Sequence, residues 1–327
     1  MIDGEVKGRE TPNCMLCGSP GGIIYRDMRD RLYTVRGAWR IRRCTNLECG
    51  LAWLDPSPLE SEQARLYESY FTHADQPATQ TPSLPRMRLT LRRAFNVLLR
   101  AISLFSERRR ASVMYLHDRP PGTLLEVGCG DGAKLAMLRS FGWRVVGQDL
   151  DTKAAHNARE KFGLDVRTTN VESIARTGVT FDAVIANHVI EHVSDPVAFV
   201  RYCTAMLAPG GRLVIMTPNI DSHGHHVFGR SWMGLDPPRH LFLFSPVSLA
   251  RICAAAEVGS ACVRTTCAHA QLFAVGSLDI RKRGRHTVRS IPALPTELRA
   301  MAVQLGAFRA YRSDPLSGEE CVLIYDK

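Results

Sequence analysis

Residues 124–127 form the clearest buried segment in the hydrophobic pattern of this chain. The run LLEV is apolar except for Glu126, and it is followed by three glycines within GCGDG. An apolar run bounded by glycines predicts a buried strand and a tight turn, and a helix is expected from about Ala133. The next apolar run, RVVGQDLD, predicts a second strand that ends at Asp149.

The same alternation continues through the middle of the chain. The segment DVRTTNVES predicts a third strand and a turn, and FDAVIANHVIEHVSDP predicts a fourth strand that runs into a helix. A Pro-Gly-Gly turn and a fifth strand are expected within LAPGGRLVIMTPN. Strands that alternate with helices predict parallel pairing, so the expected fold class is α/β with a doubly wound sheet.

A stripe with a helical period precedes this region, between residues 86 and 110. Its apolar members recur every three or four positions: Met87, Leu91, Phe95, Leu98, Ile102 and Phe105. The segment also carries eight arginines and a single acid, Glu107. The predicted helix either packs on its own domain with a solvated basic face, or contacts anionic lipid or guides an acidic substrate. The preceding THADQPATQTPSLP predicts a linker.

Length and composition are those of a globular protein with a substantial core. The chain has 327 residues, of which 45% are hydrophobic and 23% charged, and its formal net charge is +10. This charge suits acidic partners without selecting among nucleic acid, phosphorylated substrates and anionic lipid. The polar start MIDGEVKGRE gives no secretory signal, and no apolar run reaches the ~20 residues of a spanning helix. We therefore expect a cytoplasmic protein.

Two close cysteine pairs near the N-terminus predict a small zinc ribbon. Two residues separate Cys14 from Cys17, and four residues separate Cys44 from Cys49. A tetrahedral Zn²⁺ needs converging ligands, and four thiolates leave no open position, so the expected role is structural. Disulfides are not expected in a cytoplasmic chain. The alternative is four unrelated buried cysteines.

The glycine loop and Asp149 together predict a nucleoside site. Asp149 lies about 20 residues beyond Gly128, the distance at which a βαβ unit brings its second strand beside the first turn. Glycines let a ligand lie against the backbone, and the carboxylate can accept both hydroxyls of a ribose. The arrangement by itself also fits NAD, although GCGDG differs from the dinucleotide spacing GxGxxG.

Four segments in sequence order give the chain a resemblance to the class I S-adenosylmethionine-dependent methyltransferases. They are LEVGCGDG, VVGQDLD, FDAVIANHVIEHVSDP and LAPGGRLVIMTPN, and the terminal EECVLIYDK resembles that family's antiparallel last strand. The start of the chain, ending in CGLAWLDPSP, is similar to the zinc-binding start of a bacterial branch that includes sugar C-methyltransferases and enzymes of glycan and natural-product clusters. The resemblance implies a Rossmann-like, seven-stranded, mostly parallel sheet.

The resemblance also implies which residues bind S-adenosylmethionine. The loop beneath its methionine part would consist of Glu126, Gly128, Cys129, Gly130, Asp131 and Gly132. Asp149 would bind the ribose and Leu150 would lie against the adenine. Asn170, followed by Val171, stands where many members have an acid that meets the adenine amino group.

Two further pairs follow from the same resemblance. Asn187 and His188, at the end of the fourth strand, would approach the methionine group of the cofactor. Glu191 and His192 form the EH pair that is typical of this branch. The pair is either structural or in contact with cofactor or substrate.

The segment around residues 219–245 should lie over the substrate, because ligands of open α/β sheets bind at the carboxyl ends of the strands. Its candidate substrate-binding residues are Trp232 and Arg239. His240 aligns with the histidine that resembles the general base of the sugar C-methyltransferases, although PPR precedes it here. The alternative is a histidine that orders the loop. Three more histidines are either exposed or metal-binding: His223, His225 and His226.

These observations predict three parts. A zinc ribbon would span residues 1–58, a helical connector 59–118, and a methyltransferase domain 119–327, in which residues 271–310 match no known pattern. The expected reaction is S-adenosylmethionine-dependent methyl transfer to a small-molecule, sugar or lipid-linked acceptor. If this acceptor is phosphorylated, Arg239 and the basic helix would suit its acidic group. An RNA methyltransferase and a non-catalytic binding module are the alternatives. Peripheral contact with an anionic inner membrane surface is a further expectation, and the oligomeric state is left open.

Overall fold

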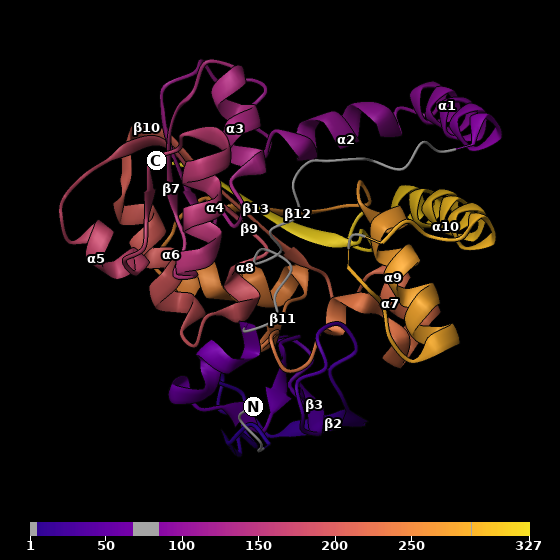
Figure 1. Cartoon of the computed structure of the whole chain (residues 1–327). Coiled ribbons are helices and arrows are strands. Elements are labelled where there is room, and N and C mark those ends of the chain that lie inside the picture. The colour runs from indigo at the N-terminus through magenta and orange to yellow at the C-terminus, as the bar shows by residue number, and fades with distance from the viewer. Residues whose placement is uncertain (1–4, 68–84, 289) are drawn as a thin grey trace.

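A seven-stranded sheet forms the centre of the structure, a computed structural model that describes residues 5–67, 85–288 and 290–327 (Figure 1). The strand order is β12-β13-β10-β9-β6-β7-β8. The strands are β6 (Thr123–Val127), β7 (Arg144–Gln148), β8 (Val166–Arg167), β9 (Phe181–Asn187), β10 (Leu207–Pro218), β12 (Cys262–Thr266) and β13 (Glu320–Asp326). Of the seven strands, β13 alone runs opposite to the other six, so the expected doubly wound, mostly parallel sheet is confirmed.

Helices cover both faces of this sheet, which explains why its central strands are apolar almost throughout. One face packs against α3 (Ala133–Ser140) and α4 (Thr152–Phe162), where Leu135 and Ala158 are fully buried. The other face packs against α5 (Val171–Ala175), α6 (Pro196–Ala205) and α8 (Pro246–Ala255). The carboxyl ends of the parallel strands meet at one edge, and β13 begins there because it runs the opposite way.

The N-terminal ribbon is a four-stranded sheet that borrows one strand from the rest of the chain. Its own strands are β2 (Gly21–Met28), β3 (Trp39–Cys44) and β4 (Ala52–Asp55), and β11 (Phe242–Leu243) completes the order β11-β4-β3-β2. A separate pair joins β1 (Gly8–Arg9) to β5 (Ser57–Pro58), and the 3-10 helix η1 (Glu60–Tyr67) follows. Since Trp53 and Phe244 share one core, the ribbon is fixed to the large domain.

The predicted basic helix is two helices, α1 (Arg86–Ala101) and α2 (Leu104–Ser112). Ser103 adopts a left-handed conformation with φ of 62° and breaks the helical path. The expected stripe is therefore only partly buried: Leu99 and Leu104 are fully covered, whereas 61% of Met87 stays exposed. In Figure 1, α1 extends away from the sheet beside α10. The predicted linker at residues 72–85 lies almost wholly outside the described residues.

The region without a recognisable pattern forms two packed helices, α9 (Ala270–Arg283) and α10 (Leu294–Ser313). Before them, residues 219–245 form α7 (His223–Phe228), two 3-10 turns, η4 (Gly229–Ser231) and η5 (Met233–Leu235), and β11. A third 3-10 turn, η3 (Ile190–His192), follows β9. These elements gather over the carboxyl edge of the sheet. Among the described residues, no helix is both long enough and apolar enough to span a bilayer.

Candidate active site

The glycine loop connects β6 to α3 in a left-handed backbone path that few residues other than glycine adopt. Gly128, Gly130 and Gly132 have φ angles of 66°, 54° and 74°. A Cβ atom on Gly128 would lie 2.5 Å from the Val189 side chain, and one on Gly132 would lie 2.6 Å from Leu164. Conformation and space therefore both require glycine, and the loop presents backbone at the carboxyl edge.

A buried acid and a partly buried base lie next to the glycine loop. Glu126 is buried at the end of β6, its Oε2 has no hydrogen-bond partner among the described residues, and burial raises its pKa to about 8. Lys134, in the first turn of α3, is also covered, and burial lowers its pKa although Glu126 and Glu320 oppose the shift. A carboxyl group and an amino group whose ionisation is favoured when an opposite charge is placed beside them fit a zwitterionic amino acid. The methionine part of S-adenosylmethionine is such a group.

The remaining predicted cofactor residues follow the next strands. Asp149, just after β7, accepts hydrogen bonds from the backbone N–H groups of Gly130 (2.7 Å) and Asp151 (2.9 Å). Leu150 next to it is 67% exposed, an unusual position for a large apolar residue and one that a flat base could cover. Asn170 caps α5, because its Oδ1 accepts from the N–H of Ser173, and Val171 is the first residue of that helix.

A histidine–carboxylate cluster lies at the same edge, after β9. His188, with φ of 57°, places Nδ1 3.2 Å from Oε1 of Glu191 and Nε2 2.8 Å from Oε1 of Glu320. Burial would lower the pKa of His188, but its bonds to Glu191 and Glu320 outweigh burial and raise the pKa to about 10. His188 is therefore an imidazolium at neutral pH. Asn187 ends β9 directly before it.

His269 completes this cluster and was not singled out from the sequence. Its Nδ1 lies 2.7 Å from Oε2 of Glu320. Glu320 pairs with Thr266 across the two antiparallel strands, so β13 supplies the carboxylate and the turn after β12 supplies the histidine. The short sequence CAHA carries no motif that would have identified His269, because only the strand pairing brings it to Glu320.

His240, the sequence-based candidate base, lies deeper than His188. Only 7% of it is exposed, and its Nδ1 donates to the backbone oxygen of Gly234 at 2.8 Å. Its Nε2 is 4.0 Å from Oε1 of Glu191 and its ring meets the His192 ring edge-on. His192 bonds through Nδ1 to the backbone oxygen of Arg239. Glu191 of the EH pair thus lies between His188 and His240, and the half-buried His192 packs against His240.

The two predicted substrate-binding residues have internal partners instead. Trp232 is 2% exposed, donates to Oε1 of Glu319 at 2.6 Å and stacks on Phe273. Arg239 is fully buried between Asp30 of the ribbon and Asp236. A guanidinium that is enclosed by two carboxylates offers no binding surface for an acidic acceptor. The structure therefore replaces the expected substrate contacts of Trp232 and Arg239 with structural ones.

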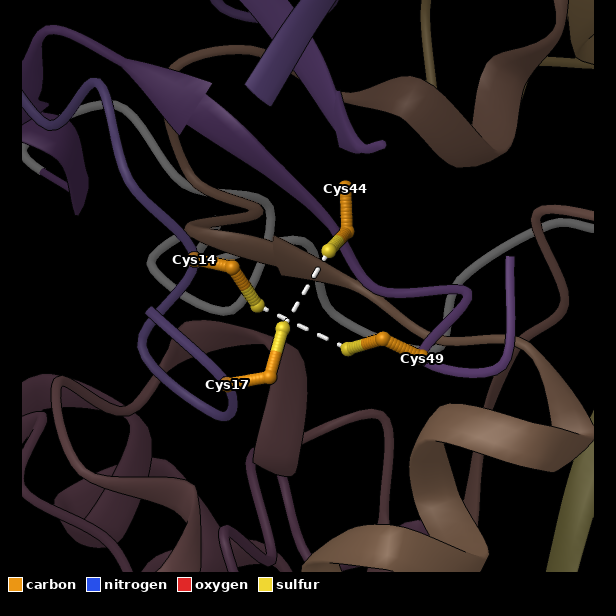
Figure 2. Close-up of side chains that lie close together, drawn as sticks. All are labelled: Cys14, Cys17, Cys44 and Cys49. Atoms are coloured by element: carbon orange, nitrogen blue, oxygen red, sulfur yellow. Dashed lines mark hydrogen bonds between the residues drawn. The ribbon is translucent and has the colours of Figure 1, made fainter. Parts of the chain in front are cut away.

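The four ribbon cysteines converge on one point (Figure 2). Sγ of Cys14 lies 3.6 Å from that of Cys49, and Sγ of Cys17 lies 3.4 Å from that of Cys44. Four sulfurs at the tetrahedral Zn–S distance of about 2.3 Å would be about 3.8 Å apart. The donor set and spacing therefore fit a zinc ion. None of the ten cysteines, all of which lie in the described residues, forms a disulfide.

One other group among the described residues has the side chains to hold a metal: Glu191, His192 and His240. The histidines of α7 do not form such a group. His225 hydrogen-bonds to the Tyr25 hydroxyl at 2.9 Å and to the backbone oxygen of Ile220. The alternative of a metal site at His223, His225 and His226 therefore has no support in the described part of the chain.

The fold and the loop together define a class I S-adenosylmethionine-dependent methyltransferase. The strand order, the single antiparallel strand and the glycine turn after β6 all belong to that architecture. A comparison with protein families agrees, because residues 91–258 match the family described as "Methyltransferase domain". The chain belongs to this family.

Curated relatives carry the name ubiquinone biosynthesis O-methyltransferase. The protein from Parvibaculum lavamentivorans is 35% identical over 116 residues, which cover 33% of this chain and 46% of that protein. The protein from Methylocella silvestris is 32% identical over 148 residues, covering 42% and 58%. The chain thus spans about half the length of the curated relatives it matches.

Solved structures of methyltransferases are also similar. A S-adenosylmethionine-dependent methyltransferase from Archaeoglobus fulgidus is 16% identical, with a TM-score of 0.45, covering 70% of this chain and 94% of that one. The plantazolicin methyltransferase BpumL, solved in complex with S-adenosylhomocysteine, is 12% identical with a TM-score of 0.44, covering 82% and 96%.

Proposed function

We propose that this methyltransferase transfers the methyl group of S-adenosylmethionine to a hydroxyl oxygen of a small-molecule acceptor. The observation that carries this proposal is the histidine–carboxylate cluster of His188, Glu320 and His269 at the carboxyl edge, beside the glycine loop. An oxygen nucleophile must lose its proton, and positioned general bases contribute about 10²–10⁴-fold in rate to such steps. The names of the relatives, which are O-methyltransferases, support the same bond type.

The bound cofactor would supply the methyl group on a sulfonium that already carries its leaving group. The chain would contribute binding and orientation. We assign the methionine part to the loop with Glu126 and Lys134, the ribose to Asp149, and the adenine to the surface of Leu150, Asn170 and Val171. We assign residues 128–132 of the glycine loop to the methionine part as well, because its backbone would lie against that part of the cofactor.

The acceptor would enter over the polar cluster, beneath the elements of residues 219–245. A phosphate on the acceptor is not part of this proposal, because Arg239 is enclosed by Asp30 and Asp236. An RNA acceptor has no specific support either. Arg88 and Arg92 of the basic helix pair with Glu297 of α10, and Arg108 bonds to Gln304.

Labelling of a cell extract with radioactive methyl donor tests this function. The purified protein is incubated with the extract, which is then separated into small molecules, lipid and RNA. We expect label in a small molecule, at an oxygen, and none with the Asp149→Ala variant. Label in RNA, or on nitrogen or sulfur, would contradict the proposal.

A further inference from the structure

His269 shares a buried carboxylate with His188 at the acceptor edge of the sheet. Its Nδ1 lies 2.7 Å from Oε2 of Glu320, while Nε2 of His188 lies 2.8 Å from Oε1 of the same group. The Glu320 side chain is fully buried, but 33% of the His269 side chain is exposed. Within the described part of the chain, no residue hydrogen-bonds to Nε2 of His269.

We propose that His269 is the general base that takes the proton of the acceptor hydroxyl, and that Glu320 is its positioning residue. This proposal rests on the proposed O-methylation. By accepting the Nδ1–H of His269, Glu320 fixes the tautomer that has its lone pair on Nε2. A carboxylate in that position also stabilises the imidazolium that forms when the base takes up a proton.

The other histidines of the cluster cannot take this role as they stand. His188 is held between two carboxylates as an imidazolium and has no lone pair to offer. His240 is 7% exposed and faces Glu191 rather than the surface. Burial and the neighbouring His240 lower the pKa of His192 to about 4, and its Nδ1 meets the backbone oxygen of Arg239. The side chain of His188 is 30% exposed, but both of its ring nitrogens face carboxylates. His269 instead pairs one nitrogen with Glu320 and leaves Nε2 without a hydrogen-bond partner among the described residues.

The position of the pair relative to the glycine loop also fits this role. Lys134, in the first turn after the loop, interacts electrostatically with both Glu126 and Glu320. Glu320 thus faces His269 and His188 directly, and the charge of Lys134 acts on the same carboxylate. The carboxylate that orients the base is therefore also under the influence of a residue assigned to the methionine part of the cofactor.

The proposed step balances without a further reactant. The acceptor oxygen gives its proton to Nε2 of His269 and forms a bond to the methyl carbon. The carbon–sulfur bond of the donor breaks, and its electron pair remains on sulfur as a neutral thioether. The proton on His269 then passes to water, which can reach the exposed side chain.

The experiment compares variants of the full chain, with the labelled small-molecule fraction of the extract as acceptor. We expect His269→Gln to lower kcat/KM by about 10²-fold or more, while S-adenosylhomocysteine affinity stays within about twofold of wild type. His156→Gln, on the exposed side of α4, is the matched control and should leave both unchanged. His240→Asn should lower kcat/KM less than His269→Gln.

Two readouts separate a base from a residue that only shapes the site. Loss of the base should remove the acid limb from the pH profile of kcat/KM, and added imidazole should restore part of the activity of His269→Ala. Glu320→Gln should weaken activity and shift the same limb. If kcat/KM for oxygen methylation in His269→Gln stays within a few-fold of wild type, or if imidazole does not restore the lost activity, His269 is not the general base. The proposed O-methylation would still stand in that case. Label on nitrogen or sulfur in the wild type would overturn the proposed function and the base with it.

Discussion

The backbone N–H of Gly130 donates to Oδ2 of Asp149 over 2.7 Å, and this bond ties the glycine loop to the end of β7. The carboxylate assigned to the ribose therefore also holds the loop assigned to the methionine part. Loss of Asp149 should affect both parts of the cofactor.

We expect Asp149→Ala to weaken S-adenosylhomocysteine binding at least about tenfold, because hydrogen bonds to charged groups contribute roughly 1.5–3 kcal/mol each. Isothermal titration calorimetry measures this, with Asp165→Ala, at an exposed acid before β8, as control. Normal affinity in Asp149→Ala would contradict the assignment of the ribose site.

Cofactor binding should release a proton from Glu126 near pH 7. Burial holds the pKa of the free carboxyl at about 8, so it is mostly protonated, and an ammonium group placed beside it would favour ionisation. The binding enthalpy should therefore depend on the ionisation enthalpy of the buffer, by up to one proton. This dependence should disappear in Glu126→Gln, and its persistence there would place the proton elsewhere.

The same carboxyl predicts how the stability of the free protein depends on pH. Its folded pKa lies above its usual value of 4.5, so between these values the folded state holds a proton that the unfolded state has released. The contribution is fully present below pH 4.5 and is lost as pH rises through 8. Between pH 4.5 and 8, the melting temperature of Glu126→Gln should therefore fall less than that of the wild type. An equal fall in both proteins would contradict this role of Glu126.

The ribbon should contain one zinc ion per chain. Because the four sulfurs converge, Cys14→Ser with Cys17→Ser should remove the metal and lower the melting temperature of the whole chain, whose core continues from Trp53 to Phe244. Elemental analysis checks the metal, and Cys262→Ser, at an exposed cysteine, is the control. If the double variant kept its full zinc content, the cysteines would not be the ligands, and Glu191, His192 and His240 would be the next candidates.

Arg239 should matter for stability. Replacing it by methionine leaves Asp30 and Asp236 as uncompensated buried charges, and breaking such a pair costs about 3–5 kcal/mol. Chemical denaturation should show this loss, whereas Arg29→Ala at a neighbouring exposed arginine should show almost none. Unchanged stability combined with a raised KM would restore the original expectation of substrate binding.

The exposed side of α1 should bind anionic bilayers. Met87, Leu91 and Leu98 are 61%, 36% and 43% exposed, and they share one face of the helix. Three exposed arginines spaced seven apart form a stripe further around the helix, about 140° from that face: Arg86, Arg93 and Arg100. An apolar face and a basic stripe on the exposed surface of one helix suit the interface of an anionic membrane.

Sedimentation with vesicles tests this surface. The wild type should bind vesicles that contain phosphatidylglycerol more than pure phosphatidylcholine, and Leu91→Gln with Leu98→Gln should reduce the binding. Arg109→Gln, on α2, serves as the control. Absence of vesicle binding by the wild type would contradict a membrane-binding face. A wild-type dimer that dissociates in the double variant would instead identify the face as a contact between two copies of the chain.

The sequence by itself determined the sheet and the cofactor loop, because both depend on local signals. The apolar runs and glycines around Glu126 and Asp149 specify strand, turn and strand over short distances, and the spacing of the four cysteines predicts a zinc site. The sequence predicted strands less well where the local apolar pattern was weak. The third strand is only two residues long, and β12 was not anticipated.

Tertiary structure decided the acceptor side of the site. His188, His269 and Glu320 are far apart in the sequence, and only the pairing of β12 and β13 with the edge of the parallel sheet brings them together. The same holds for Arg239, whose partner Asp30 lies 209 positions away in the ribbon. A charged or polar residue type shows what chemistry is available. Whether that residue meets a substrate or a buried partner depends on long-range packing, which local patterns do not encode.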